Sequence, residues 1–299
     1  MAHACREREM GGGFNKKARN DGVDEEEEGK LGRWEGLNPE LLALILVRLP
    51  AEERVATAAL VCRSWLETVA GPYCWAEIDV ERWCRRCDQP DTIDLAVKRL
   101  VRRSKCTFWR LSAYRIGDGA FSFLANRAKS LKVLQIPMSE VTDKMVERHA
   151  ESLANVSVLD ISNCLKITSK GLESFGKQCQ NLTHLKRNMP PPEWERPTPG
   201  LASSRVDDTE AMMIANTMTG LHQLELCFGR LGDSGLHALL TRCEKLTHLD
   251  IQGCWNLELK GDLEEKCEQL AVYRSPWLDY DEDVVLSDSG AESSSDSIS

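Results

Sequence analysis

Residues 156–161 read VSVLDI, and residues 246–251 read LTHLDI. Both follow the pattern apolar-x-x-apolar-x-apolar, which recurs along residues 106–278. The pattern begins at Cys106, Leu131, Val156, Leu182, Leu221, Leu246 and Leu270. These positions are separated by 25, 25, 26, 39, 25 and 24 residues. A period of about 25 residues indicates a stacked repeat array, because one such unit cannot bury its apolar face alone.

Each strand pattern is followed by a helical pattern with a polar start, as at residues 142–146, 168–172 and 232–236. One strand and one helix per period predict an α/β horseshoe with a parallel concave sheet and convex helices. Cysteines recur at matching positions. Cys164 and Cys254 follow a strand, and Cys179 and Cys243 close a helix. We interpret them as packing residues, since a free cysteine behaves as a small hydrophobe.

Alternation along each strand sends the residues between the apolar positions to the concave face. A bound partner would contact these side chains. The predicted target-binding surface comprises Arg110, Gln135, Asp160, Lys186, Glu225 and Asp250, flanked by Phe108, Val133, Val158, His184, Gln223 and His248. His184 and His248 occupy equivalent positions, which favours polar contacts with a protein; a pH-sensing or metal-binding pair is the alternative.

The fourth copy of the pattern departs from the others, because Arg187 takes its third apolar position. Burial of a charge is costly, so we expect a distorted strand or an outward Arg187. The 39-residue spacing adds a Pro-rich insertion at residues 189–206. A loop of this length either grips a target, with Trp194 contributing, or is a tolerated insertion at the edge of the array.

Residues 33–78 have clustered helical patterns instead. Asn38 is a good N-cap, and Pro39 suits the first helical position. Apolar residues then recur at helical spacing until Pro50, and further helices are expected at 52–60 and 62–69. About 45 residues cannot bury all of these apolar side chains among themselves. The excess either faces a partner or caps the first repeat.

Residues 33–78 resemble an F-box. The similarity rests on LNPELL at 37–42, Ile45-Leu46, Leu49-Pro50, VCR at 61–63, Trp65, and Pro72 with Trp75. The early proline lies one position later than usual but still begins a helix. The repeats resemble the cysteine-containing leucine-rich-repeat class. Residues 34–275 are similar to a plant subgroup of F-box/leucine-rich-repeat proteins, through GPYCW at 71–75, RNM at 187–189, IANTM at 214–218 and GCW at 253–255. That subgroup is sometimes labelled as carrying WD repeats, but no four-strand blade pattern occurs here.

This resemblance implies an α/β protein with a helical F-box followed by a leucine-rich-repeat horseshoe of about six repeats. It implies the substrate receptor of an SCF (cullin-RING) ubiquitin ligase, which binds the Skp adaptor, and through it cullin, and captures a protein target for degradation. The chain would carry no cofactor and perform no catalysis. A non-ligase repeat scaffold is the alternative. The resemblance implies adaptor-binding roles for Leu37, Pro39, Leu41, Leu42, Ile45, Leu46, Leu49, Pro50, Val61, Cys62 and Trp65.

The composition of the 299-residue chain indicates its cellular compartment. The longest apolar run spans only residues 41–47, whereas a membrane helix needs about 20 apolar residues. Residues 1–20 contain no apolar stretch typical of a secretory signal. The twelve cysteines are therefore expected to be reduced, in the nucleus and/or cytoplasm. The basic run at 16–19 is either a nuclear address or solvated charge.

The net charge of −9 is unevenly distributed. Residues 1–32 contain an acidic run at 24–28, and residues 279–299 hold seven acids and no base, so we predict disorder at both ends. The serines of the acidic tail are either solubilising or phosphorylated. Residues 31–278 are neutral, which argues against nucleic acid or a membrane as a partner.

Residues 79–105 are expected to connect the F-box to the repeats. They contain a lone C-x-x-C at Cys84 and Cys87. Zinc needs about four ligands, and the nearest histidine, His149, lies far along the chain. We therefore favour a polar connector over a metal or redox site.

Overall fold

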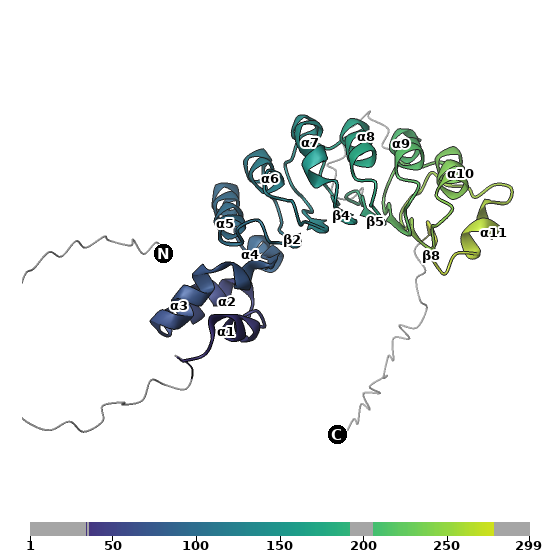
Figure 1. Ribbon diagram of the computed structural model, residues 1–299. Helices are drawn as coiled ribbons and strands as arrows, with labels where there is room; N and C mark the ends of the chain where they lie inside the picture. The colour runs from purple at the N-terminus through teal and green to yellow at the C-terminus, as the bar shows by residue number, and fades with distance from the viewer. Residues whose placement is uncertain (1–33, 35, 192–205, 278–299) are drawn as a thin grey trace, which may run out of the picture.

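The computed structural model describes residues 34, 36–191 and 206–277 (Figure 1). A helical unit at one end leads into a curved array with one parallel sheet, whose eight strands follow chain order. The strands are β1 (Glu77–Asp79), β2 (Arg110–Ser112), β3 (Val133–Gln135), β4 (Val158–Asp160), β5 (His184–Lys186), β6 (Gln223–Glu225), β7 (His248–Asp250) and β8 (Val272–Arg274). The predicted α/β horseshoe is confirmed.

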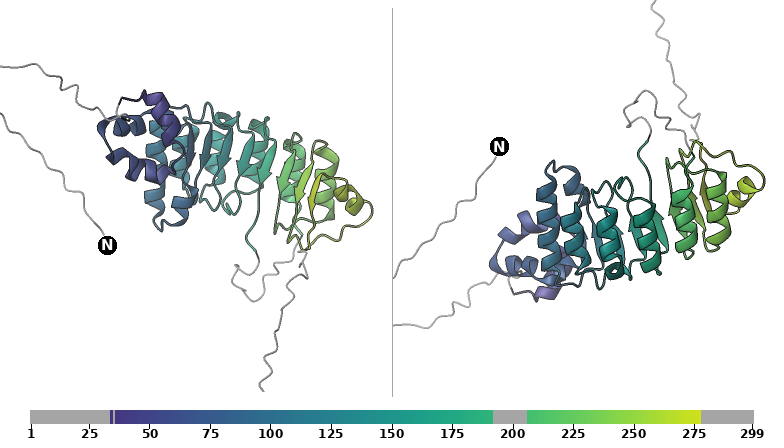
Figure 2. Two further views of the ribbon diagram at one scale, coloured as in Figure 1. Left: turned by 90° about the horizontal axis from the view of Figure 1, so that it is seen from below. Right: turned by 90° about the horizontal axis from the view of Figure 1, so that it is seen from above.

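Helices cover the convex side of the sheet and lie side by side when the molecule is viewed from above (Figure 2). They are α5 (Pro90–Arg103), α6 (Asp118–Ala125), α7 (Asp143–His149) with η3 (Ala150–Leu153), α8 (Ser169–Gln178), α9 (Thr209–Thr217), α10 (Asp233–Arg242) and α11 (Leu263–Glu268). The short α4 (Glu81–Arg85) precedes α5 and lies near the helical unit at the end of the array. Among the described residues, no helix is long and apolar enough to cross a membrane.

The array begins earlier than the sequence pattern indicated. β1 pairs with β2, and α4 and α5 complete a coil within the expected connector 79–105. The first coil escaped the repeat pattern because 33 residues separate Glu77 from Arg110, and because Ile78 is the only apolar residue of β1. The sheet consequently has eight strands where about six repeats were expected.

The register of β2 differs from the expected pattern by two residues. Leu111 pairs with Leu134, so the inward residues are Phe108, Leu111 and Ala113, all fully buried. Trp109, expected to point inward, is exposed. The sequence pattern had placed Phe108 on the concave face. Phe108 lies in the core instead. Cys106 does not begin the strand phrase, because it adopts a left-handed backbone conformation with φ 66° in the preceding turn.

Aspartates near the helix starts tie successive coils together. Each accepts a hydrogen bond from a backbone N–H of the next coil. The pairs are Asp94–Gly117 (2.9 Å), Asp118–Thr142 (2.8 Å), Asp143–Thr168 (2.8 Å), Asp208–Gly232 (2.7 Å) and Asp233–Glu258 (2.9 Å). We call these five residues the aspartate ladder. The ladder omits α8, which begins with Ser169 and precedes the insertion.

Glycines next to the ladder occur in two of the three copies of the helix-start motif, at residues 168–172 and 232–236. A Cβ atom at Gly171 would lie 2.5 Å from Oδ1 of Asp143, and one at Gly235 would lie 2.4 Å from Oδ1 of Asp208. Both separations are too short for a side chain. Glycine therefore lets each carboxylate approach the backbone of the next coil.

The repeated cysteines are buried, as expected for packing residues, and they also donate hydrogen bonds. Cys164 and Cys254 donate to the carbonyls of Ile136 and Leu226, at 3.2 and 3.1 Å. Burial raises the pKa of Cys164, Cys179 and Cys254 to about 12, which keeps these thiols protonated at neutral pH. They link neighbouring coils as weak donors.

The helical unit comprises α1 (Pro39–Leu46), α2 (Ala51–Ala56), η1 (Ala58–Leu60), α3 (Arg63–Ala70) and η2 (Pro72–Trp75). The predicted N-cap is confirmed, because Asn38 Oδ1 accepts a hydrogen bond from the Glu40 N–H at 2.7 Å. Trp75 is fully buried and donates its indole N–H to the Val69 carbonyl at 2.7 Å. The guanidinium of Arg103, from α5, lies 5.8 Å from its ring. Trp75 thus joins the helical unit to the first coil.

Candidate functional site

The helical unit presents apolar side chains to solvent. On α1, Leu41, Leu44 and Ile45 lie on one face, because residues three and four apart are neighbours on a helix. Leu44 is 65% exposed, Leu60 81% and Val61 60%. We define the F-box apolar surface as Leu41, Leu44, Ile45, Leu60, Val61 and Leu66, all of them exposed. Clusters of this kind typically mark protein interfaces.

Two of the expected adaptor-binding residues lie in the interior. Leu42 and Leu46 are 0% and 1% exposed, on the opposite side of α1 from Leu41 and Ile45. Because they pack the helical unit itself, they cannot contact a partner in this conformation. Pro39 and Pro50 are exposed, whereas Leu37, Leu49, Cys62 and Trp65 are half-buried. Trp65 packs edge-on against Trp34, with ring centroids 6.4 Å apart.

The sequence prediction omitted three of the exposed residues, Leu44, Leu60 and Leu66. Burial of every third or fourth residue of α1 leaves Leu44 outside, a signal that helical periodicity contains. Leu60 ends a 3₁₀ turn instead of lying in a continuous helix, so periodicity could not place it. The exposed apolar residues of the helical unit therefore differ from the predicted adaptor-binding set.

The concave face carries the predicted target-binding residues of β3 to β7. Gln135, Asp160, Lys186, Glu225 and Asp250 form one row, since each pairs in register with the next. Val133, Val158, His184, Gln223 and His248 form the row beside it. Arg110 belongs to this second row, in register with Val133. Its guanidinium nevertheless reaches Gln135 Oε1 at 2.8 Å.

The first row is internally paired. Lys186 Nζ lies 2.8 Å from Glu225, and Arg274, which the sequence prediction omitted, lies 3.1 Å from Asp250. Gln223 also donates to Glu225 at 2.9 Å. Burial raises the pKa of Asp160, while the Ser162 N–H and nearby Lys186 oppose that shift. A partner would therefore meet a mixed row of acceptors and paired cations.

His184 and His248 lie in one row, with Gln223 between them, as their equivalent positions predicted. Each ring Nδ1 lies within hydrogen-bond distance of the preceding threonine hydroxyl, at 2.7 Å from Thr183 and 2.8 Å from Thr247. Burial lowers the pKa of His184, and His222 and His248 lower it further. This environment favours the neutral imidazole.

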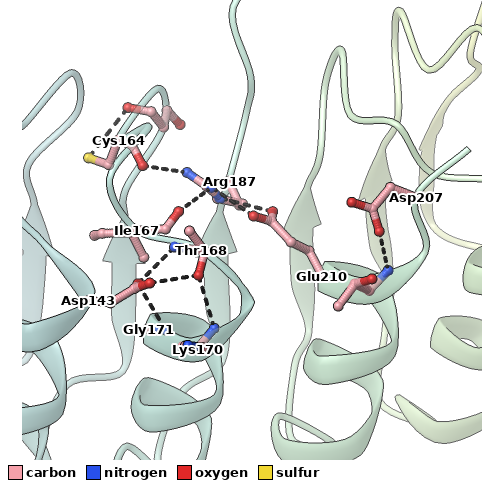
Figure 3. Close-up of polar contacts among 11 residues, drawn as sticks. Asp143, Cys164, Ile167, Thr168, Lys170, Gly171, Arg187, Asp207 and Glu210 are labelled. Atoms are coloured by element: carbon pink, nitrogen blue, oxygen red, sulfur yellow. Dashed lines mark hydrogen bonds and ion pairs between the residues drawn. The ribbon is translucent and has the colours of Figure 1, made fainter. Parts of the chain in front are cut away.

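Arg187 corrects another expectation, because it points inward and is only 2% exposed (Figure 3). Its guanidinium donates to the Cys164 and Ile167 carbonyls at 3.0 and 2.7 Å. It also pairs with Glu210 of α9 at 2.8 Å. The charge is tolerated because these partners replace water. The ion pair connects the two sides of the insertion, whose residues 192–205, including Trp194, lie outside the described part.

Cys84 and Cys87 belong to the first coil. Cys84 is fully buried in α4, and burial raises its pKa to about 11. Cys87 is half-buried, and its thiol lies near the Gln89 carbonyl at 3.7 Å. Within the described ranges, no cluster of three or more metal-binding side chains occurs.

A helical unit with an exposed apolar surface, joined to a leucine-rich-repeat horseshoe, defines an F-box/leucine-rich-repeat architecture. Residues 34–81 match the F-box-like family. F-box protein FBW2 of Arabidopsis thaliana is 37% identical over 235 residues, which cover 78% of this chain and 72% of the relative.

Two further relatives from the same plant give the same result. F-box protein SKIP19 is 31% identical over 255 residues, covering 84% of this chain and 79% of the relative. Putative F-box/LRR-repeat protein 22 is 30% identical over 275 residues, covering 88% and 84%. The chain belongs to the plant F-box/leucine-rich-repeat proteins.

Proposed function

We propose that this protein is the substrate-recognition subunit of an SCF ubiquitin ligase. The F-box apolar surface binds the Skp adaptor, which links the chain to cullin, and the concave face holds a protein target for ubiquitination and degradation. The chain performs no covalent step itself and acts in the nucleus and/or cytoplasm. Its contribution is proximity, because tethering raises the effective concentration of target lysines to roughly millimolar.

One observation carries the adaptor-binding role: six large apolar residues of the F-box apolar surface remain exposed after the chain has folded. The six residues do not contribute to the core of the helical unit, because Leu42, Leu46 and Trp75 already fill its interior. If the helices served only to cap the first repeat, this surface would face the array. The first coil instead contacts the helical unit on the side of Trp75.

Recovery of a purified plant Skp adaptor on the immobilised chain tests the proposal. Leu60→Asp combined with Val61→Asp should reduce recovery at least tenfold, because anchors at an interface centre are typically worth more than about 2 kcal/mol each. These side chains are exposed, so the fold should survive. The matched control is Leu165→Asp, a leucine on the array whose exposure (61%) equals that of Val61 (60%) within one per cent.

Equal recovery by the two variants would remove the ligase role. The non-ligase scaffold would then be the better description, since the repeats would still be able to hold partners. Circular dichroism of each variant should match that of the unmodified chain, which separates a lost contact from a lost fold.

A further inference from the structure

A strongly basic stretch lies within the neutral body of the chain. Residues 99–132 contain nine lysines and arginines but only one acid, Asp118, giving a net charge of +8. Because residues 31–278 sum to zero, the remainder of the body carries the opposite charge. Residues 31–278 therefore contain one strongly basic stretch and an acidic remainder, although their total charge is zero.

Most of these cations gather at the edge of the array where helices end and strands begin. We call this the basic edge, made of Arg102, Arg103, Lys105, Arg127, Lys129 and Lys132. Arg102 and Arg103 close α5, Lys105 follows in the next turn, and the others lie between α6 and β3. The guanidiniums of Arg127 and Arg102 lie 3.8 and 5.7 Å from the same ring, that of Phe123.

None of the six forms an ion pair with a carboxylate in the described residues. On the opposite edge, Lys98 and Lys166 do pair, with Asp94 and Glu140. An open polar groove continues the basic edge across β3 to β5. Its lining comprises Lys129, Ser130, Lys132, Asn155, Ser157 and Asn181. The Asn155, Ser157 and Asn181 side chains donate to backbone carbonyls of the preceding coils, so the lysines supply the binding groups. Cations without a carboxylate partner along an open groove suit an extended chain of carboxylates.

We propose that the basic edge binds the acidic C-terminal tail of the same chain, residues 279–299. The tail contains seven acids and no base, so its charge of −7 opposes that of the basic edge. Every carboxylate in the tail is free of a neighbouring cation in the sequence. Charge complementarity within one chain thus identifies the occupant.

The tail is long enough to make this contact. It follows Trp277, just after β8, and the groove begins at β3, five strand positions away. Five strand spacings amount to about 24 Å. The tail leaves at the ends of the strands and the groove lies at their starts, so the tail must also cross a strand, a further distance of about 10 Å. Twenty-one residues reach up to about 70 Å when fully extended, which is ample for this path. Tethering of the two sites on one chain raises their effective concentration, so even a weak affinity populates the contact.

Zero-length crosslinking of the full chain is the direct test. A carbodiimide joins an amine to a carboxylate only when the two are in contact. Mass spectrometry of the monomeric product should find Lys129 or Lys132 linked to residues 279–296. The yield should fall at least tenfold in 1 M salt, where the Debye length is about 3 Å.

A competition experiment locates the contact. A fluorescent peptide of residues 279–299 is titrated onto the full chain whose seven tail acids are replaced by their amides. It should bind this chain at least tenfold more tightly than the unmodified chain, because the native tail competes. Lys129→Glu with Lys132→Glu should abolish the gain, whereas Lys144→Glu with Lys170→Glu, exposed on the opposite edge, should preserve it.

Three outcomes would overturn the proposal. Links from these lysines to the acidic run at 24–28 would identify the other terminus as the occupant. Links confined to crosslinked dimers would show binding between molecules. Equal peptide affinity for both chains would show that the tail leaves the basic edge open. Adaptor recovery is measured separately, so this proposal and the proposed function can fail independently.

Discussion

At the residue scale, Arg187 shows how a repeat accommodates a charge in its core. The equivalent positions in neighbouring coils hold Ile161, Leu226 and Ile251, all buried. Arg187 occupies the same inward position and uses its guanidinium to bind two carbonyls and Glu210 (Figure 3). No pattern in the sequence indicated Glu210 as its partner, because 23 residues and the insertion separate them. The periodicity had placed Arg187 inward, and the expectation of an outward side chain came from the cost of burying a charge without knowledge of these partners.

Replacing Arg187 by leucine should destabilise the chain by about 3 kcal/mol, although leucine matches the neighbouring coils. The substitution leaves the Ile167 carbonyl without a donor, removes one of the two donors to the Cys164 carbonyl and leaves Glu210 without its cation. Glu210→Gln should cost less, because this carboxylate is partly solvated. Urea unfolding of both variants and of the double variant measures the coupling. A neutral or stabilising Arg187→Leu would contradict this account.

His184 should make stability depend on pH. Its pKa lies below 6.5 in the folded chain, so the unfolded chain binds more protons as the pH falls. Acidification from pH 7.5 to 5.5 therefore costs stability through this residue. His184→Gln should lose less stability over that interval than the unmodified chain, as measured by urea unfolding at both pH values. An equal loss in the two chains would show that His184 does not contribute.

At the element scale, the aspartate ladder ties five helix starts, but not that of α8, to the next coil. Asp143 accepts hydrogen bonds from the Thr168 N–H, the Thr168 hydroxyl and the Gly171 N–H, at 2.8, 2.6 and 3.0 Å. The sequence showed the recurrent helix-start motif but not its reason. That reason is a contact with the preceding coil. Comparing the sequences of single repeats does not show which residues of two neighbouring coils touch.

Asp143→Ala should lower the free energy of unfolding by about 2–3 kcal/mol, because it leaves two backbone N–H groups without an acceptor. Lys144→Ala, at the exposed neighbouring position, is the matched control and should change stability by less than about 0.5 kcal/mol. Thermal or urea unfolding gives both values. If the two variants were equally stable, the ladder would be incidental to the stacking of coils.

At the scale of the whole molecule, the sequence predicted the class and architecture correctly but misplaced its boundaries. The 25-residue period located β3, β4, β6 and β7, since each has a full set of apolar positions. It missed β1, where Ile78 is the only apolar residue. Helical periodicity separates the two faces of α1, but both are apolar, so only the packing of α1 against α3 shows which face is buried. The basic edge was hidden by averaging charge over the whole body.

The proposed division of labour predicts that changes at the two ends act separately. Asp160→Lys, Glu225→Lys or Asp250→Lys should weaken target capture while adaptor recovery stays within twofold, because these residues lie on β4, β6 and β7. Targets captured by the Leu60→Asp, Val61→Asp chain supply the assay. Loss of capture only after substitutions on the convex helices would assign the target to the other side of the array.

The uniform register of the sheet has a geometric consequence for the placement of cargo. Each strand pairs in register with its neighbour, so the same position advances by about 4.8 Å from one strand to the next. Moving a contact from β4 to β6 shifts it by two such steps relative to Trp75, where the array meets the helices. Distance from the F-box is thus counted in whole coils. Gain or loss of a coil would move a target bound on the concave face by a fixed distance from the F-box. The side chains of the remaining strands would be unchanged.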